Sequence, residues 1–252
     1  MNRKDFFVLM VRLILGYVFF SSGLCKLTHG NFGQIIGPPT LIEDLQEYGL
    51  AGFGYLVAIS QVLFGALIFT QRFSLLGLIG LVPMNISILA FTLSQGWTGT
   101  PYVNFFMLLL NLIALLYEWP SLRVLVWPYE EEKRLLPHSI RLFDEASWAF
   151  GLLALASLAM VVGMWFYPMA TILGCIFFTV TAVFLVKSQD MSLWELGVLA
   201  CFFLSILSIT LAKQLYELGL NAMIAFIVFL GLGLGIYLLS FFFKRKPIQL
   251  IS

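Results

Sequence analysis

Two basic residues on one face of an apolar stretch are the first sign of chemistry in this chain. Arg12 lies within the run 6–24, which otherwise has the composition of a membrane span. A charge at that depth costs about 3 kcal/mol on insertion scales, so such a residue normally faces protein or water and has a partner. Spacings of four and three residues continue this helical face through Gly16, Phe19, Gly23 and Lys26. We expect this face to organise any site that the protein has.

Polar residues also interrupt the next three apolar stretches. Gln61 and Asn85 lie near the middle of the second and third stretches, and Asn111 lies near the middle of the fourth. Together with Arg12 they are the predicted ligand-binding residues, suited to the polar head group of a quinone, a lipid or a small anion. The alternative is that they only join helices, since interhelical hydrogen bonds of this kind contribute about 0.6 kcal/mol each.

Charged residues near the ends of these stretches predict structural contacts. Glu118 follows the fourth stretch and lies at the depth of Arg12 if successive spans alternate in direction. Arg12, Glu118 and Arg72 are therefore the candidates for structural ion pairs. Lys26 and Asn104 are expected at the opposite end, near the outer surface and close to an acidic loop. No cluster has the spacing of metal ligands, so we predict no metal site, and the sequence assigns no catalytic residue.

The composition identifies an integral membrane protein. The chain has 252 residues, of which 61% are hydrophobic and 11% are charged, and its mean hydropathy is +0.98. A soluble domain has about 45–50% apolar and about 25% charged residues. The net charge of +1 gives no basic field that would attract nucleic acid.

Long apolar runs predict an all-α integral membrane protein with eight transmembrane helices. A linker at 121–146 divides them into two four-helix halves, at 1–120 and 147–252. The predicted spans are 6–25, 50–70, 73–95, 102–118, 147–166, 169–187, 192–212 and 221–243.

The distribution of Lys and Arg predicts the orientation, because loops rich in basic residues stay in the cytoplasm. If the N-terminus is cytoplasmic, the outer segments carry only Lys26 and Lys213. Both termini are then cytoplasmic, and a bacterial-type cell membrane is the expected location. The eleven inner basic residues are Arg3, Lys4, Arg72, Arg123, Lys133, Arg134, Arg141, Lys187, Lys244, Arg245 and Lys246.

Two connections are longer than turns. The outer segment 27–49 contains Gly-Pro-Pro and three acidic residues, and we expect a re-entrant or interfacial segment that caps the bundle. The inner segment 119–146 contains the charged run 130–134. It is interpreted as a solvated linker with a short amphipathic helix, and the alternative is a docking site for a cytoplasmic partner.

The first apolar stretch resembles the opening motif of the DoxX-like membrane proteins, a superfamily that includes the DoxD and MauE types. The resemblance rests on Arg12-Leu-Ile-Leu-Gly16, on Phe19-Phe20 and on the segment 22–27, Ser-Gly-Leu-Cys-Lys-Leu. Residues 61–72 resemble the family's second helix, although the family more often has a glutamate at the position of Gln61. The family's G-x-G ending after the fourth span is absent. The resemblance covers about residues 6–120 and implies a four-helix bundle.

The resemblance also implies a membrane subunit near quinone or thiol redox chemistry that works with partner proteins. The first functional hypothesis is therefore a redox subunit that binds a quinone in spans one to four and has no cofactor of its own. The alternative is a non-catalytic structural or assembly subunit of a larger membrane complex. The third is a transporter or lipid-handling protein, for which Pro83 is a candidate helix break. The expected partners are the lipid bilayer and other membrane subunits.

Overall fold

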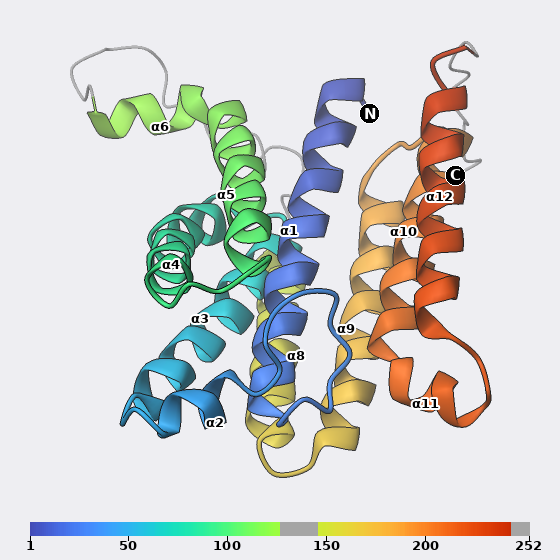
Figure 1. Ribbon diagram of the computed structural model, residues 1–252. Helices are drawn as coiled ribbons and strands as arrows, with labels where there is room; N and C mark the ends of the chain where they lie inside the picture. The colour runs from blue at the N-terminus through green and yellow to red at the C-terminus, as the bar shows by residue number, and fades with distance from the viewer. Residues whose placement is uncertain (127–145, 243–252) are drawn as a thin grey trace.

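The computed structural model describes residues 1–126 and 146–242, and these residues are helical with no strand (Figure 1). Eight helices are long and apolar enough to cross a membrane, which confirms the predicted fold class. Their ends lie within four residues of the predicted ones. The eight are α1 (Arg3–Leu27), α3 (Ala51–Phe69), α4 (Ser74–Ser94), α5 (Thr100–Tyr117), α8 (Ala146–Gly163), α9 (Tyr167–Ser188), α10 (Leu193–Thr210) and α12 (Ala222–Leu239).

Three short helices lie at the two ends of the bundle. Helix α1 begins and α12 ends at one face, here called the terminal face, where α6 (Trp119–Val126) runs sideways from the end of α5 (Figure 1). Helices α2 (Leu41–Gln46) and α11 (Ala212–Glu217) lie at the opposite face, here called the loop face. Helix α2 packs on α3 and so caps the bundle as predicted. Residues 127–145 of the predicted partner site at 121–146, with its charged run 130–134, lie outside the described residues. So do the basic residues 133, 134, 141 and 244–246.

Local sequence signals explain where several helices begin. The Asn2 side chain caps α1 by accepting from the Lys4 backbone N–H, and Ser192 and Glu195 form a capping box at the start of α10. Prolines stand in the first turns of α5 and α9, where no intrahelical N–H is needed. Pro83 lies inside α4, but the helix continues through it. The predicted third span is therefore not broken.

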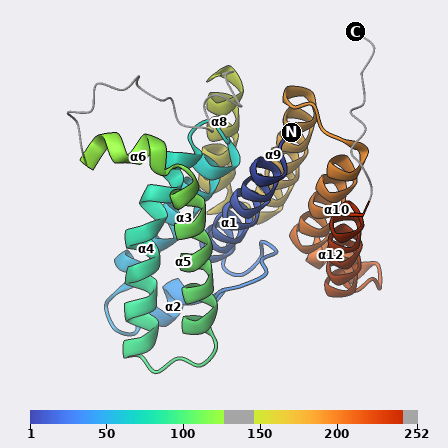
Figure 2. The same cartoon turned by 90° about the horizontal axis from the view of Figure 1, so that it is seen from above.

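Helix α1 is the central element of the fold. It packs against α3, α5, α8 and α10 and lies between the two halves (Figures 1 and 2). Nineteen of its 25 residues are buried, whereas α12, at the edge, buries only Ala222 and Gly233. The two four-helix halves thus meet on α1, and the buried polar residues of this helix, such as Arg12 and Lys26, face protein rather than lipid.

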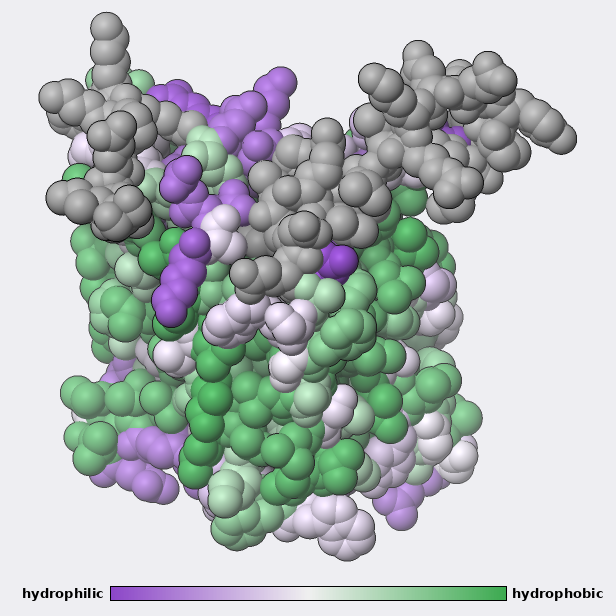
Figure 3. Space-filling model, turned by 180° about the vertical axis from the view of Figure 1, so that it is seen from behind, coloured by the Kyte–Doolittle hydropathy of each residue, from purple (hydrophilic) through white to green (hydrophobic). Residues whose placement is uncertain are grey.

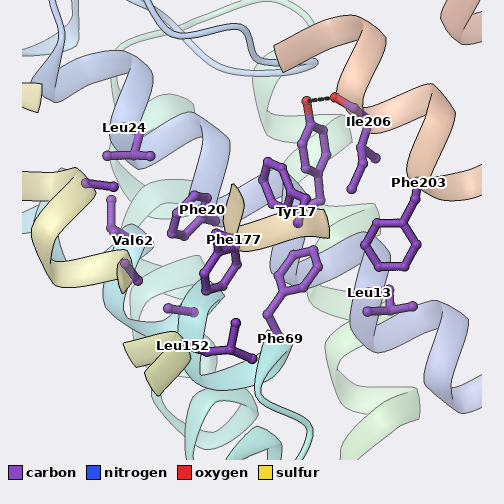
Figure 4. Close-up of a cluster of buried hydrophobic side chains, with 14 of the residues drawn as sticks. Leu13, Tyr17, Phe20, Leu24, Val62, Phe69, Leu152, Phe177, Phe203 and Ile206 are labelled. Atoms are coloured by element: carbon purple, nitrogen blue, oxygen red, sulfur yellow. Dashed lines mark hydrogen bonds between the residues drawn. The ribbon is translucent and has the colours of Figure 1, made fainter. Parts of the chain in front are cut away.

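An aromatic core joins α1 to both halves (Figure 4). Phe20 stacks on Phe177 of α9 with ring centroids 4.7 Å apart and an interplanar angle of 4°. The Tyr17 hydroxyl donates to the backbone oxygen of Ile206 in α10 at 3.1 Å, which satisfies a buried polar group. The core therefore fixes the position of α1, and with it the faces on which Arg12 and Lys26 lie.

The surface has the distribution that a bilayer requires. Figure 3 shows a broad apolar band with hydrophilic residues gathered toward both ends of the molecule. Large apolar side chains are exposed along α5 and α12, among them Phe105, Phe106 and Leu230. A soluble protein rarely leaves such a large continuous apolar surface in water. The chain is a multi-pass membrane protein.

Candidate functional site

Small residues bring α1 and α3 into close contact. A Cβ atom added to Gly65 would lie 2.6 Å from the Phe20 backbone nitrogen and 2.8 Å from the Gly16 oxygen. One added to Gly23 would lie 2.5 Å from the Ala58 oxygen. Small residues at such positions let two membrane helices pack backbone to backbone. This contact places the α3 face that carries Gln61 directly against the glycine face of α1.

Lys26 lies where these two faces meet, and it is buried. Side chains of a helix point back toward its N-terminus, so the ammonium group reaches one turn deeper than its own backbone. Its Nζ donates to the Ser22 oxygen at 3.0 Å, to Ser22 Oγ at 2.6 Å and to Gln61 Oε1 at 3.1 Å. Lys26 stands in the last turn of α1, at the loop face, yet only 2% of it is exposed. Helix–helix packing, not visible in a single span, buries it.

Every hydrogen-bond partner of this ammonium group in the described chain is neutral. No described carboxylate lies within 4 Å of Lys26 Nζ, and the nearby acidic residue Glu43 pairs instead with His29. A buried charge normally has a counter-charge, because leaving it unpaired in a low-dielectric environment is costly. Lys26 is thus a buried cation whose charge the described residues do not balance.

An apolar cavity ends at Lys26, and we call it the loop-face pocket. Its volume is about 60 Å³, and helices α1 to α5 line it. Its polar lining residues are Ser22, Lys26, Gln61, Thr92, Thr100 and Asn104. Its walls include Phe19, Phe53, Phe91, Trp97 and Met107. An apolar cavity with a few convergent polar groups is the usual form of a small-molecule site.

The connection between α1 and α2 covers the pocket. Ile36, Gly37 and Pro38 line the cavity, and Leu41 and Leu45 of α2 extend this cover. Gly37 has a φ of +121°, which side-chain-bearing residues rarely adopt. A Cβ atom there would lie 2.7 Å from Ser22 Oγ and 3.4 Å from Lys26 Nζ. Glycine is therefore needed for the loop to approach the ammonium group this closely.

Arg12 lies nearer the terminal face and has a carboxylate partner. Its Nη2 donates to Glu118 Oε1 at 2.5 Å, and the two residues are 2% and 1% exposed. Tyr117 donates to Asp5 beside this pair. Fourteen residues separate Arg12 from Lys26, a rise of about 21 Å along a helix. The structure therefore brings Arg12 and Glu118 together as the sequence predicted and keeps them apart from the pocket.

Three buried asparagines lie on two neighbouring helices. Asn104 and Asn111 are on one face of α5, and Asn85 is on α4. Asn104 Nδ2 donates to the Asn85 backbone oxygen at 2.7 Å. Asn85 and Asn111 are fully buried, and their side-chain amide atoms have no hydrogen-bond partner among the described residues. Such buried amides are uncommon in native structures. Asn104 lines the loop-face pocket, whereas Asn85 and Asn111 do not.

The four predicted ligand-binding residues do not share one cavity. Gln61 is hydrogen-bonded to Lys26, and Arg12 is paired with Glu118. Arg72 lies in the turn between α3 and α4 and is half-buried. That Asn85 and Asn111 bind a ligand stays a prediction. The pocket instead brings together Gln61 with Lys26 and Asn104, which the sequence had suggested only as residues of the outer face.

Sequence reasoning missed three residues of the pocket. Ser22 stands one helical turn before Lys26, and this i, i+4 spacing could have identified it as a partner. Gly37 belongs to the Gly-Pro-Pro segment, which was noted only as a cap. Trp97 follows α4, a position typical of an interfacial aromatic. Its ring packs edge-on against Phe91, with centroids 5.9 Å apart, and lines the cavity.

Metal-ligating residues and comparison with known proteins add no further assignment to this site. The described part of the chain holds no group of three His, Cys, Asp or Glu residues that could bind a metal ion. The resemblance of α1 to the DoxX-like proteins stays a prediction. Comparison of the chain with protein-family models, with curated proteins and with solved structures yields no match.

Proposed function

We propose that this multi-pass membrane protein binds the ring of a lipophilic quinone in the loop-face pocket, as a membrane subunit of a redox system. The observation that carries the proposal is the pair of buried donor side chains, Lys26 and Gln61, in the wall of an aromatic-lined cavity. Electrons would reach the quinone from a partner protein, because we propose no redox centre in this chain.

The donors suit a quinone carbonyl oxygen, which only accepts hydrogen bonds. Gln61 Oε1 accepts from Lys26, and this leaves the Gln61 amide NH₂ as the donor for a ligand. The Lys26 ammonium can exchange one neutral acceptor for the ligand oxygen without losing a hydrogen bond. Because these groups are buried, a hydrogen bond from the charged donor contributes about 1.5–3 kcal/mol.

The lining of the cavity also suits a ring. Its volume of about 60 Å³ is less than half that of a cavity that holds one benzene ring, about 150 Å³, so binding of a ring requires the pocket to widen. Phe19, Phe53 and Phe91 contribute aromatic surfaces, which favour offset or edge contacts with another ring.

The direct test is titration of the purified full-length protein in lipid nanodiscs with a decyl-substituted benzoquinone. Trp97 lies in the cavity wall, so bound quinone should quench its fluorescence, and a Trp97→Phe variant identifies that contribution. Gln61→Leu should weaken binding about three- to tenfold, the effect of one neutral hydrogen bond. Asn111→Leu is the matched control, since it changes a buried amide outside the cavity. Absence of saturable quenching in the wild type would reject the proposal.

The unbalanced charge of Lys26 favours one other candidate, a lipid-handling protein that binds a fatty acid carboxylate in the same pocket. The same titration with decanoic acid, followed by competition with the quinone, separates the two. Displacement of quinone by micromolar decanoic acid would support the lipid-handling function. Quinone binding that decanoic acid leaves unchanged supports the redox subunit.

A further inference from the structure

We propose that a groove between α1 and α12 is a binding site for one anionic phospholipid. The site lies at the terminal face, away from the loop-face pocket, and does not depend on the quinone proposal. It consists of an apolar groove for an acyl chain and a basic rim for the phosphate group.

The acyl part is a cavity of about 210 Å³ between α1, α10 and α12. On α1 it is lined by Phe7, Met10 and Ile14, which lie on one helical face and span about 10 Å of helix. On α12 it is lined by Leu230 and Leu234, which are exposed in the isolated protein. Almost all of its lining surface is apolar, as a hydrocarbon chain requires.

The groove continues toward the terminal face into a second cavity, of about 480 Å³, between α1, α5 and α12. Phe7 and Tyr237 line both cavities, so the two cavities adjoin at these side chains. Arg3 and Lys4 line the second one. A molecule with its chain beside Ile14 would therefore have its head group beside two cations, at the face where a bilayer meets water.

The rim carries more positive than negative charge. Arg3 and Lys4 line it, Glu118 is paired with Arg12, and the Asp5 carboxylate, which accepts from the neutral Tyr117, offsets only one of the two cations. The Lys4 ammonium is exposed and forms no hydrogen bond or ion pair with the described residues. Arg3 is held in place, since it donates to the Ser240 oxygen at 3.0 Å and lies over the Phe241 ring. The N-terminus of α1 adds its dipole to this positive end.

These features together favour an anionic phospholipid over a neutral one or a free anion. A neutral lipid would fill the groove equally well but gains nothing from two cations beside its head group. A free phosphate would contact the cations but not the apolar groove. Basic pockets between membrane helices near the surface recognise anionic head groups in this way.

The test is native mass spectrometry of the full-length protein released from nanodiscs with equal amounts of phosphatidylglycerol and phosphatidylcholine. We expect the wild type to retain one phosphatidylglycerol with about tenfold preference, given two basic contacts. Lys4→Gln should reduce this preference to about threefold or less. Lys187→Gln, which removes an exposed lysine at the end of α9, is the matched control and should leave it unchanged.

The groove is tested separately. Leu234→Trp places a large side chain in the acyl cavity and should abolish retention of the lipid, whereas Leu232→Trp, at an exposed α12 position outside the cavity, should not. An equal preference for the two lipids in the wild type would overturn the proposal, as would retention unaffected by both Lys4→Gln and Leu234→Trp. Displacement of the lipid by millimolar inorganic phosphate would also overturn it.

Discussion

Two buried cations on one helix have opposite surroundings. Arg12, toward the terminal face, is paired with the Glu118 carboxylate. Arg12 lines none of the cavities described above. Lys26, toward the loop face, has only neutral hydrogen-bond partners in the described chain and ends an apolar cavity. Both are 2% exposed, so burial alone does not distinguish them.

The difference indicates which cation is structural and which is available to a ligand. A buried ion pair neutralises itself, and its loss is costly because it leaves one charge unpaired. A buried cation beside a cavity can instead gain an interaction when a ligand arrives. The Arg12–Glu118 pair is therefore assigned to holding α1 against α5, and Lys26 to the proposed binding site. The predictions below test this division, from the largest expected effect to the smallest.

The largest effect is expected from Arg12→Met. It removes the guanidinium that donates to the buried Glu118 carboxylate, so we expect the free energy of unfolding to fall by about 3–5 kcal/mol. Unfolding in mixed detergent micelles measures this. The double variant Arg12→Met, Glu118→Met replaces the pair with apolar side chains and should recover most of the loss. A stable Arg12→Met protein that no longer binds quinone would reverse the assignment.

A substitution at Gly37 should affect the loop-face pocket around Lys26. In Gly37→Ala the added Cβ meets Ser22 Oγ and enters the space beside Lys26. Overpacking of this kind costs about 1–3 kcal/mol, so quinone affinity should fall about tenfold. Gly49→Ala is the control, because Gly49 has a φ of +71° but no atom within 4 Å of the added Cβ. If both variants bind like the wild type, the loop does not form the wall of a ligand site.

The smallest effect is expected from Asn111→Leu. The Asn111 side-chain amide is buried without a hydrogen-bond partner in the described chain. An apolar side chain of similar size removes the energetic cost of burying this unsatisfied polar group. We expect stability to change by less than about 1 kcal/mol, or to increase. The same unfolding assay measures it. A loss greater than 2 kcal/mol would mean that the amide holds a bound group, as the sequence first suggested.

Much of the bundle could be predicted from sequence because bilayer-spanning helices have a length and an apolarity that single segments show. The Arg12–Glu118 contact could also be predicted, since alternating spans fix the depth of each charge. The loop-face pocket could not be predicted from the sequence. The depth of Lys26 follows from its place in the last turn of α1, but its burial depends on contact between the glycine face of α1 and α3 and on the approach of Gly37. These are contacts between separate segments of the chain, and the spacing of residues within one helix does not predict them.

The most direct measurement is quinone affinity and unfolding free energy of Lys26→Met, made beside those of Arg12→Met. Removing Lys26 leaves no described carboxylate unpaired, so stability should change by less than about 2 kcal/mol. Quinone affinity should fall about tenfold to a hundredfold, the loss of one hydrogen bond from a charged donor. Unchanged quinone affinity in Lys26→Met would contradict the account, because the pocket would then bind without the residue that distinguishes it.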